Sequence, residues 1–222
     1  MNDPLAEFPP SPKRTVVVFL HGIGGSGVQE VQDQKDKFPE LMTWMAPDRV
    51  SRSWFNVVSW LPTLDLQSGL WSLQEDSASL HQAVRDLDAR IELDLRDSDE
   101  IVLVGFSQGG SLAAFAWRHS RLAHRFTAVF TVCSHMPEWY LWPDEGKELP
   151  LLRARKIPLT MIFGTHDILF PSTALQQFAN KWERELQLLT IVHLPHGHNL
   201  TDVHFSMIQQ SVGPPHYKAK TE

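Results

Sequence analysis

Residues 105–109 read Gly-Phe-Ser-Gln-Gly, and this pentapeptide constrains the fold more than any other stretch of the chain. An aliphatic run, Ile101–Val104, comes directly before it, and residues 111–117 place apolar side chains at helical spacing directly after it. The pattern predicts a strand, a sharp turn and a helix. The flanking glycines lack the Cβ atoms that would clash in so tight a turn. Ser107 would then present its hydroxyl above the sheet, at the positive end of a helix, as a nucleophile.

Six short apolar runs are distributed along the chain, and several of them show no alternation between apolar and polar residues. Continuous runs of this kind are typical of a parallel sheet that is covered on both faces. The predicted strands are Thr15–Leu20, Phe55–Trp60, Ile101–Val104, Ala128–Cys133, Leu159–Phe163 and Leu189–Leu194. Helical patterns lie between the strands, so we expect an α/β fold, a three-layer sandwich with a mostly parallel central sheet.

Three apolar stripes with intervals of three or four residues predict helices that cover this sheet. The first stripe runs from Leu80 to Leu95, and we interpret Ser72–Glu75 as a capping box ahead of it. A second stripe occupies residues 175–186, and Val203–Ile208 predicts a short final helix. Residues 28–53 and 137–150 show no clear period, so we interpret both as excursions over the sheet, either walls of a substrate groove or ordinary loops.

The chain has 222 residues and a formal net charge of −6. This length suits one α/β domain, expected at residues 15–212 between a flexible leader, 1–14, and a flexible tail, 213–222. Acidic residues spread along the chain argue against a nucleic-acid partner and against attraction to an anionic membrane. Cys133 is the only cysteine, no signal peptide is recognisable, and no apolar run could span a bilayer. These features favour a cytoplasmic location.

A serine hydroxyl becomes a nucleophile only beside a base, and the base needs an orienting acid. Asp167 follows the apolar run Leu159–Phe163, so we expect it in a loop at the carboxyl end of a strand. His193, His196 and His198 cluster around the end of the last predicted strand, and we favour His198 as the base because Gly197 lets the backbone turn its ring inward. The cluster is alternatively a zinc site. Its spacing matches no strong zinc pattern, so we expect no metal.

A glycine-rich segment, residues 21–27, directly follows the first predicted strand. Its glycines allow a close approach of the backbone, so we expect the N–H groups of Ile23 and Gln108 to form an oxyanion hole. The segment also fits the G-x-G-x-x-G pattern of a phosphate-binding loop. No acidic residue stands on a second strand about twenty residues later, and no Lys-Ser/Thr ends the loop, so the oxyanion loop is favoured.

Together these segments resemble the acyl-protein thioesterases and lysophospholipase-like carboxylesterases of the α/β-hydrolase fold. The resemblance covers residues 15–210 and rests on segments that occur in the family's order: Phe19–Gly24 with Gly27, Ser53–Phe55, Gly105–Gly110, Gly164–Pro171 and Gly197–His198. It implies a triad of Ser107, Asp167 and His198, an oxyanion hole formed by Ile23 and Gln108, and no cofactor.

The resemblance also implies hydrolysis of acyl thioesters or esters, with S-acylated proteins or lysophospholipids as substrates. Apolar residues crowd the stretch 61–73, so Leu66, Leu70, Trp71 and Leu73 are candidate substrate-binding residues, and Trp54 is a further candidate. We expect an acyl-chain partner, at most transient membrane contact, and a monomer or weak homodimer. A short-chain carboxylesterase and a non-catalytic α/β-hydrolase that serves as a binding protein remain alternatives.

Overall fold

The computed structural model describes residues 14–27, 29–30, 32, 43–45, 53–65, 70–136, 156–170 and 189–212. Six strands form one parallel sheet with the order β2-β1-β5-β6-β7-β8. Their bounds are β1 (Thr15–Leu20), β2 (Thr43–Met45), β5 (Glu100–Phe106), β6 (Phe126–Val132), β7 (Leu159–Gly164) and β8 (Leu189–Leu194). The helices are α2 (Ser77–Asp94), α3 (Gln108–His119), the short 3₁₀ helix η1 (Ala123–Arg125) and α6 (Asp202–Val212).

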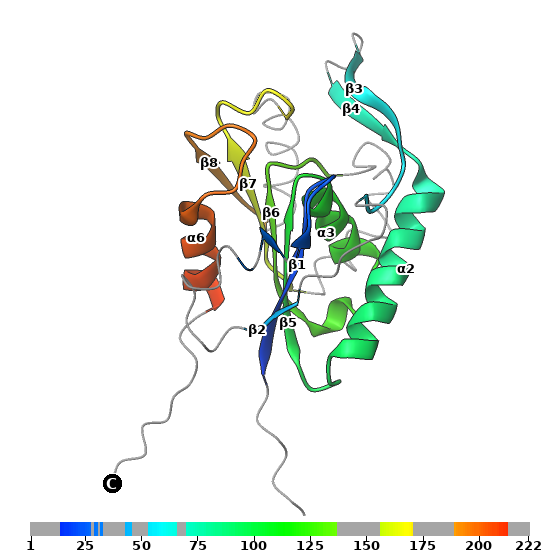
Figure 1. Ribbon diagram of the computed structural model, residues 1–222, viewed down its shortest axis with the longest axis vertical. Helices are drawn as coiled ribbons and strands as arrows, with labels where there is room; N and C mark the ends of the chain where they lie inside the picture. The colour runs from blue at the N-terminus through cyan, green and yellow to red at the C-terminus, as the bar shows by residue number, and fades with distance from the viewer. Residues whose placement is uncertain are drawn as a thin grey trace, which may run out of the picture.

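Helices cover both faces of this sheet, as Figure 1 shows, with α2 and α3 on one face and α6 on the other. The residues of β1 alternate between the two faces because successive side chains of a strand point in opposite directions. Val16, Val18 and Leu20 belong to the core beneath α2 and α3, whereas Val17 and Phe19 belong to the core beneath α6. Both faces are apolar, so the strand reads as an unbroken apolar run, and the expected three-layer sandwich is confirmed.

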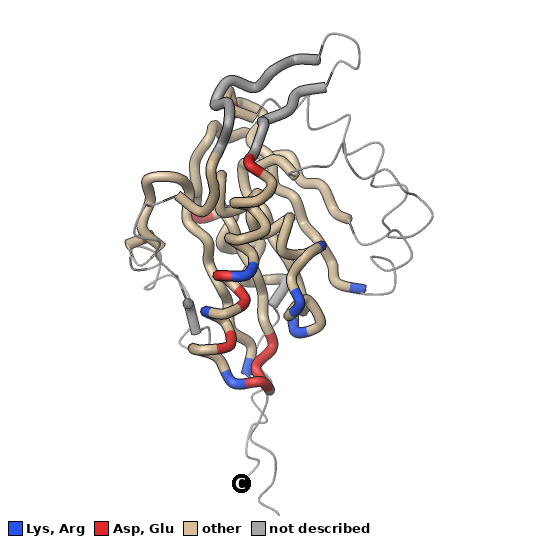
Figure 2. The backbone as a smooth tube through the Cα atoms, turned by 90° about the vertical axis from the view of Figure 1, so that its right-hand side faces the viewer, with Lys and Arg blue, Asp and Glu red and all other residues tan. Residues whose placement is uncertain are grey.

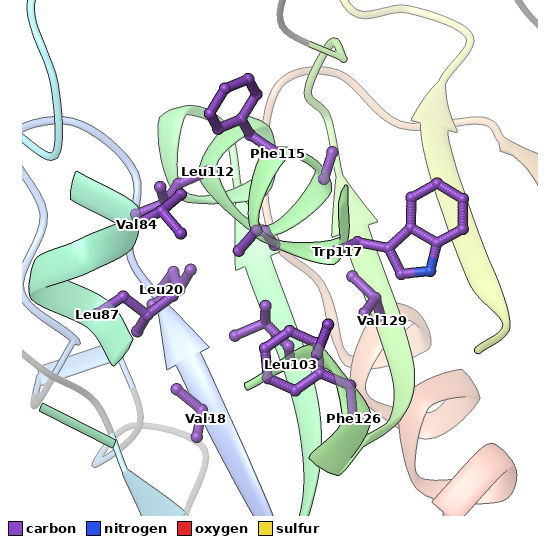
Figure 3. Close-up of a cluster of buried hydrophobic side chains, with 14 of the residues drawn as sticks. Val18, Leu20, Val84, Leu87, Leu103, Leu112, Phe115, Trp117, Phe126 and Val129 are labelled. Atoms are coloured by element: carbon purple, nitrogen blue, oxygen red, sulfur yellow. The ribbon is translucent and has the colours of Figure 1, made fainter. Parts of the chain in front are cut away.

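The larger core lies between the sheet and the helices α2 and α3 (Figure 3). Leu103 from β5 and Leu112 from α3 are completely buried there, and Val84 and Leu87 bring in the apolar face of α2. Each such aliphatic side chain contributes about 1.5–3 kcal/mol when it leaves water. The predicted stripe from Leu80 to Leu95 therefore serves as a core face.

Five of the six predicted strands are confirmed as β1, β5, β6, β7 and β8, with ends shifted by at most two residues. The prediction for Phe55–Trp60 is wrong in its placement. The strand there, β3 (Val57–Asp65), is outside the main sheet and pairs antiparallel with β4 (Leu70–Glu75). In the sequence, two apolar runs flank Gln67-Ser68-Gly69, and the strands that they form satisfy each other's backbone hydrogen bonds. A single-strand interpretation overlooks this pairing.

The predicted capping box at Ser72–Glu75 is also wrong, because these residues belong to β4. Helix α2 begins instead after Asp76, whose Oδ1 accepts hydrogen bonds from the N–H groups of Ala78 (3.1 Å) and Ser79 (3.4 Å). An aspartate at this position satisfies N–H groups of the first turn without a reciprocal glutamate.

Several predictions concern residues outside the described part of the chain. These are the helical stripe at 175–186, the excursion at 137–150, most of the excursion at 28–53, the tail at 213–222 and nearly all of the leader. The strand β2 lies within the stretch 28–53. The described helices include none with the length and apolar character needed to cross a bilayer.

Candidate active site

Ser107 occupies a strained turn between β5 and α3. Its φ of 53° and ψ of −119° lie in a region that residues with side chains rarely adopt, and such strain persists only where the surroundings impose it. Ser107 is also the N-cap of α3, yet its hydroxyl makes no capping hydrogen bond. A serine in this position usually caps the helix. The hydroxyl is therefore directed to another partner.

The glycines around Ser107 are required by close backbone contacts. A Cβ on Gly105 would lie 2.2 Å from the carbonyl oxygen of Gly109, and a Cβ on Gly109 would lie 2.2 Å from that of Leu20. A Cβ on Gly110 would lie 2.6 Å from Oγ of Ser134. Real Cβ atoms do not approach other atoms so closely, so the G-x-S-x-G-G spelling follows from the packing of this turn.

The partner of the Ser107 hydroxyl is His198. Nε2 of His198 lies 2.9 Å from Oγ of Ser107, and Nδ1 lies 2.9 Å from Oδ2 of Asp167. A carboxylate only accepts hydrogen bonds, so Nδ1 carries the proton and Nε2 is left to accept from the serine. The structure thus brings together the three residues that the sequence proposed, from loops that follow β5, β7 and β8.

Asp167 is held as a charged group although its side chain is only 1% exposed. Burial acts to raise the pKa of this carboxyl, but the hydrogen bonds from His198 and from the backbone N–H groups of Leu169 (2.9 Å) and Phe170 (3.0 Å) leave the pKa below its ordinary value. The carboxylate therefore stays ionised near neutral pH, and it can orient an imidazole and stabilise its protonated form.

Two aromatic rings flank the His198 imidazole. The ring centroid of Phe106 lies 5.2 Å away and that of Phe170 lies 5.5 Å away. Phe170 is also stacked on His135, at 5.4 Å and an interplanar angle of 13°. Such packing restricts the rotation of the imidazole. Phe170 was not among the residues predicted for the site, although its position shortly after Asp167 gave a signal.

Cys133 lies beneath this group, just past the end of β6. Its thiol is fully buried and 3.5 Å from the carbonyl oxygen of Gly197, to which it can donate. The metal-binding atoms of Cys133, Asp167 and His198 lie within 4.8 Å of one another. Burial and the charge of Asp167 raise the pKa of the thiol to about 12, so it is protonated at neutral pH and is a poor metal ligand.

The other clustered histidines have different surroundings. The ring of His193 packs 5.9 Å from that of Phe163, and the ring of His196 packs 5.5 Å from that of His204. Among the described residues, the alternative zinc cluster of His193, His196 and His198 does not form.

The glycine-rich segment lies beside Ser107, as expected for an oxyanion loop. A Cβ on Gly22 would lie 3.4 Å from Cβ of Ser107 and 3.0 Å from the Phe106 ring. Ile23 follows directly and is 43% exposed, and Gln108 begins helix α3. The segment that carries Ile23 thus lies next to the turn that carries Gln108. That their two N–H groups form an oxyanion hole stays a prediction.

The candidate substrate-binding residues have varied positions. Leu66 lies outside the described part of the chain. Leu70, Trp71 and Leu73 belong to β4, above the carboxyl end of the sheet in Figure 1. Trp54 is only 5% exposed, and its indole N–H donates to the carbonyl oxygen of His21 at 2.8 Å.

Comparisons with known proteins agree with this fold. The sequence model of the phospholipase/carboxylesterase family matches residues 1–213. Acyl-protein thioesterase 1 homolog 2 from Dictyostelium discoideum is 26% identical over 205 residues, which cover 82% of this chain and 85% of the relative.

Two plant crystal structures have the same α/β-hydrolase fold. Acyl-protein thioesterase 2 from Zea mays superposes with a TM-score of 0.73 at 16% identity, over 92% of this chain and 95% of its own. SOBER1 from Arabidopsis thaliana gives a TM-score of 0.67 at 21% identity, over 89% of this chain and 96% of its own. At these identities the two structures establish the fold alone.

Proposed function

Because the chain belongs to the phospholipase/carboxylesterase family, we propose that it is a serine hydrolase that cleaves acyl thioesters or esters, with Ser107 as nucleophile. The observation that carries this proposal is the hydrogen-bonded series from Ser107 through His198 to Asp167, with 2.9 Å at each link. The strained backbone of Ser107 supports the same role, as does its hydroxyl, which does not cap helix α3.

In the first half of the reaction, Oγ of Ser107 attacks the acyl carbonyl carbon while Nε2 of His198 takes the hydroxyl proton. The carbonyl oxygen becomes an oxyanion, and the N–H groups of Ile23 and Gln108 donate to it. The intermediate then collapses, the bond to the thiol or alcohol breaks, and His198 returns the proton to the leaving group. Ser107 is left as an acyl ester.

In the second half, water attacks the acyl-serine ester as His198 takes one of its protons. Collapse of this second intermediate releases the fatty acid and returns the proton to Ser107. Asp167 remains a carboxylate throughout, because its pKa lies below the ordinary value. Its charge stabilises the imidazolium that forms twice in each cycle.

The Ser107→Ala variant tests this assignment. Turnover of a p-nitrophenyl ester should fall by about 10⁴-fold, since the nucleophile and the base act as one unit. A fluorophosphonate probe should label the wild-type protein and not this variant. The matched control is Ser206→Ala at an exposed position of α6, which should keep full activity and labelling. Near-normal turnover in Ser107→Ala contradicts the proposal, and an unlabelled wild type favours the non-catalytic binding protein.

For the substrate, we propose S-acylated proteins or lysophospholipids. Large apolar side chains are exposed on the glycine-rich loop and on the loop that carries Asp167: Ile23 at 43%, Ile168 at 86% and Leu169 at 54%. An apolar rim of this kind suits a fatty-acyl chain better than a small polar acid. The name of the Dictyostelium relative, an acyl-protein thioesterase, supports the same substrate class.

A series of p-nitrophenyl esters and acyl thioesters, from acetyl to palmitoyl, separates this proposal from its alternative. A palmitoyl optimum supports depalmitoylation or lysophospholipid hydrolysis. A maximum at about two to four carbons identifies a short-chain carboxylesterase, because a shallow pocket gains nothing from a longer chain.

We further propose that the protein acts in the cytoplasm, as a monomer or weak homodimer that contacts membranes only transiently. The single cysteine supports a reducing compartment. The net charge of −6 disfavours stable attraction to anionic lipid. Analytical ultracentrifugation and sedimentation with vesicles would measure both properties.

A further inference from the structure

The side chain of Gln108 makes a set of buried hydrogen bonds with the segment Ser53–Phe55. Its Oε1 accepts from the backbone N–H of Trp54 at 2.9 Å, and its Nε2 donates to the carbonyl oxygen of Phe55 at 2.9 Å. Nε2 also lies 3.1 Å from Oγ of Ser53. Gln108 is only 5% exposed. Its amide therefore fastens a distant segment, more than fifty residues away in sequence, to the first residue of α3.

The fastened segment is in turn bonded to the oxyanion loop through Trp54. The indole N–H donates to the carbonyl oxygen of His21 at 2.8 Å, and the two rings lie 4.7 Å apart. Nδ1 of His21 lies 2.6 Å from the carbonyl oxygen of Gly22, to which it donates. His21 is fully buried and only two residues before Ile23. The path from Gln108 to the loop thus consists of short, buried contacts.

The same carbonyl oxygen of His21 also lies against the backbone of the turn that carries Ser107. A Cβ on Gly109 would lie 2.5 Å from the carbonyl oxygen of His21, so the loop and the start of α3 are in contact. The loop is therefore held at His21 by two contacts, one with the start of α3 and one with the Trp54 indole.

From these contacts we propose that Gln108 is a positioning residue that sets both donors of the oxyanion hole. Its own backbone N–H is one donor, and its side chain fixes the second, the N–H of Ile23, through Trp54 and His21. Trp54, a candidate substrate contact in the sequence, then acts through the loop and not on the acyl chain. This inference rests on the proposed hydrolase function.

Gln108→Met and Trp54→Phe test the path at two points. Gln108→Met keeps the length of the side chain, and Trp54→Phe keeps a smaller aromatic ring. Both changes remove the hydrogen bonds that lead to the loop. A displacement of the oxyanion hole by about an ångström costs about 10²-fold in kcat, so we expect losses of this order with little change in KM. The loss of an interaction that exists only in the transition state lowers kcat and kcat/KM equally.

A long-chain trifluoromethyl ketone gives a second readout that a merely structural role would not move. Oγ of Ser107 bonds to the ketone carbon, the hydroxyl proton passes to His198, and the ketone oxygen becomes an anion in the oxyanion hole. The inhibition constant should therefore weaken by about the same factor as kcat/KM in both variants.

The matched controls are Trp117→Phe and Gln82→Met. The indole of Trp117 is buried like that of Trp54 and donates to the carbonyl oxygen of Ile157 at 3.1 Å, but it lies far along α3. Gln82 is an exposed glutamine on α2 that bonds to Asp86 and Arg85. Both controls should leave kcat and ketone affinity within about twofold, since they do not contact the loop.

The outcomes separate this inference from the proposed function. Parallel losses of kcat and ketone affinity in Gln108→Met and Trp54→Phe, with unchanged controls, support the positioning role. Lower melting temperatures with unchanged kcat and ketone affinity overturn it and leave the hydrolase proposal standing. If Gln108→Met does not fold, as judged by circular dichroism, Trp54→Phe alone decides. A wild type that neither turns over esters nor binds the ketone overturns the function and this inference together.

Discussion

Two buried aspartates lie at opposite ends of the same sheet, and one is bound by arginines and the other by a histidine. Asp99, just before β5, accepts hydrogen bonds from Arg14 (2.7 Å) and Arg96 (3.1 Å). Asp167, just after β7, accepts one from His198 at 2.9 Å. Burial acts to raise the pKa of both carboxyls, and in both the hydrogen bonds outweigh it, so that each pKa lies below the ordinary value.

The difference between the two ends lies in what the partner can do. A guanidinium is permanently charged, so the cluster around Asp99 has one protonation state near neutral pH. An imidazole gains and loses a proton in this range, so the group around Asp167 can take part in proton transfer. In Figure 2, most of the charged residues in the described part of the chain lie toward the lower part of the tube, where the strands begin. One end of the sheet fixes structure, and the other is available for chemistry.

The largest expected effect comes from Asp167→Asn. The asparagine amide can donate to Nδ1 of His198, which moves the imidazole proton to Nε2 and prevents it from accepting the Ser107 proton. Turnover of a p-nitrophenyl ester should fall by about 10³–10⁴-fold, as it does when other triads lose their acid. Steady-state kinetics measures the loss. Circular dichroism should show an unchanged fold, and a variant with more than a tenth of the wild-type turnover would remove Asp167 from the mechanism.

The same change at the other end, Asp99→Asn, should act on stability and leave turnover unchanged. It removes the negative charge that pairs with Arg14 and Arg96, whose side chains are 38% and 52% exposed and so remain partly hydrated. The free energy of unfolding should fall by about 2–3 kcal/mol, below the full cost of a stranded buried charge. Urea denaturation followed by fluorescence measures the change.

Turnover is the critical comparison for Asp99→Asn. The carboxyl lies at the amino ends of the strands, away from Ser107, so kcat should stay within about twofold of the wild type. A tenfold loss of kcat at a temperature where the variant is folded would show that the two ends are coupled, and the division between structure and chemistry would then be wrong.

The catalytic end was the more predictable part of this molecule, because its constraints are local. Gly105 and Gly109 are required by contacts within one turn and with the neighbouring strand. The sequence pattern that contains them therefore identifies the turn before any fold is known. Asp167 and His198 could be found because each follows an apolar run, and the carboxyl ends of parallel strands meet at one edge. Both signals need only residue order.

Other features depend on contacts that residue order does not contain. β2 has three residues and is a strand only because it pairs with β1. The apolar run that became β3 resembles a sheet strand, and only its pairing with β4 distinguishes it. Cys133 lies beside Asp167 because β6 stands between β5 and β7, a matter of strand order. Trp54 was a candidate substrate contact in the sequence, and residue order does not reveal the hydrogen bond from its indole to the carbonyl oxygen of His21.

The smallest expected effect concerns a second histidine, His204 on α6, which can be compared with His198. Burial and the nearby His196 lower the pKa of His204 to about 4, and its Nδ1 accepts from the backbone N–H of Thr201 at 3.0 Å. His204 therefore takes up a proton more readily in the unfolded chain than in the folded protein. The free energy of unfolding should fall as the pH drops through 6.5 toward 4. Between pH 7.5 and pH 5 the loss attributable to His204 should be about 2 kcal/mol.

His204→Asn isolates this contribution, because the asparagine oxygen can accept from Thr201 but cannot be protonated in this range. The difference in unfolding free energy between pH 7.5 and pH 5 should shrink by about 2 kcal/mol relative to the wild type. The control is Ser206→Ala, at an exposed position of the same helix, which should leave the pH dependence unaltered. Equal slopes in His204→Asn and the wild type would mean that His204 takes up its proton without cost. His204 and His198 would then not differ in their ability to take up a proton in the folded protein, and the comparison between the two histidines would fail.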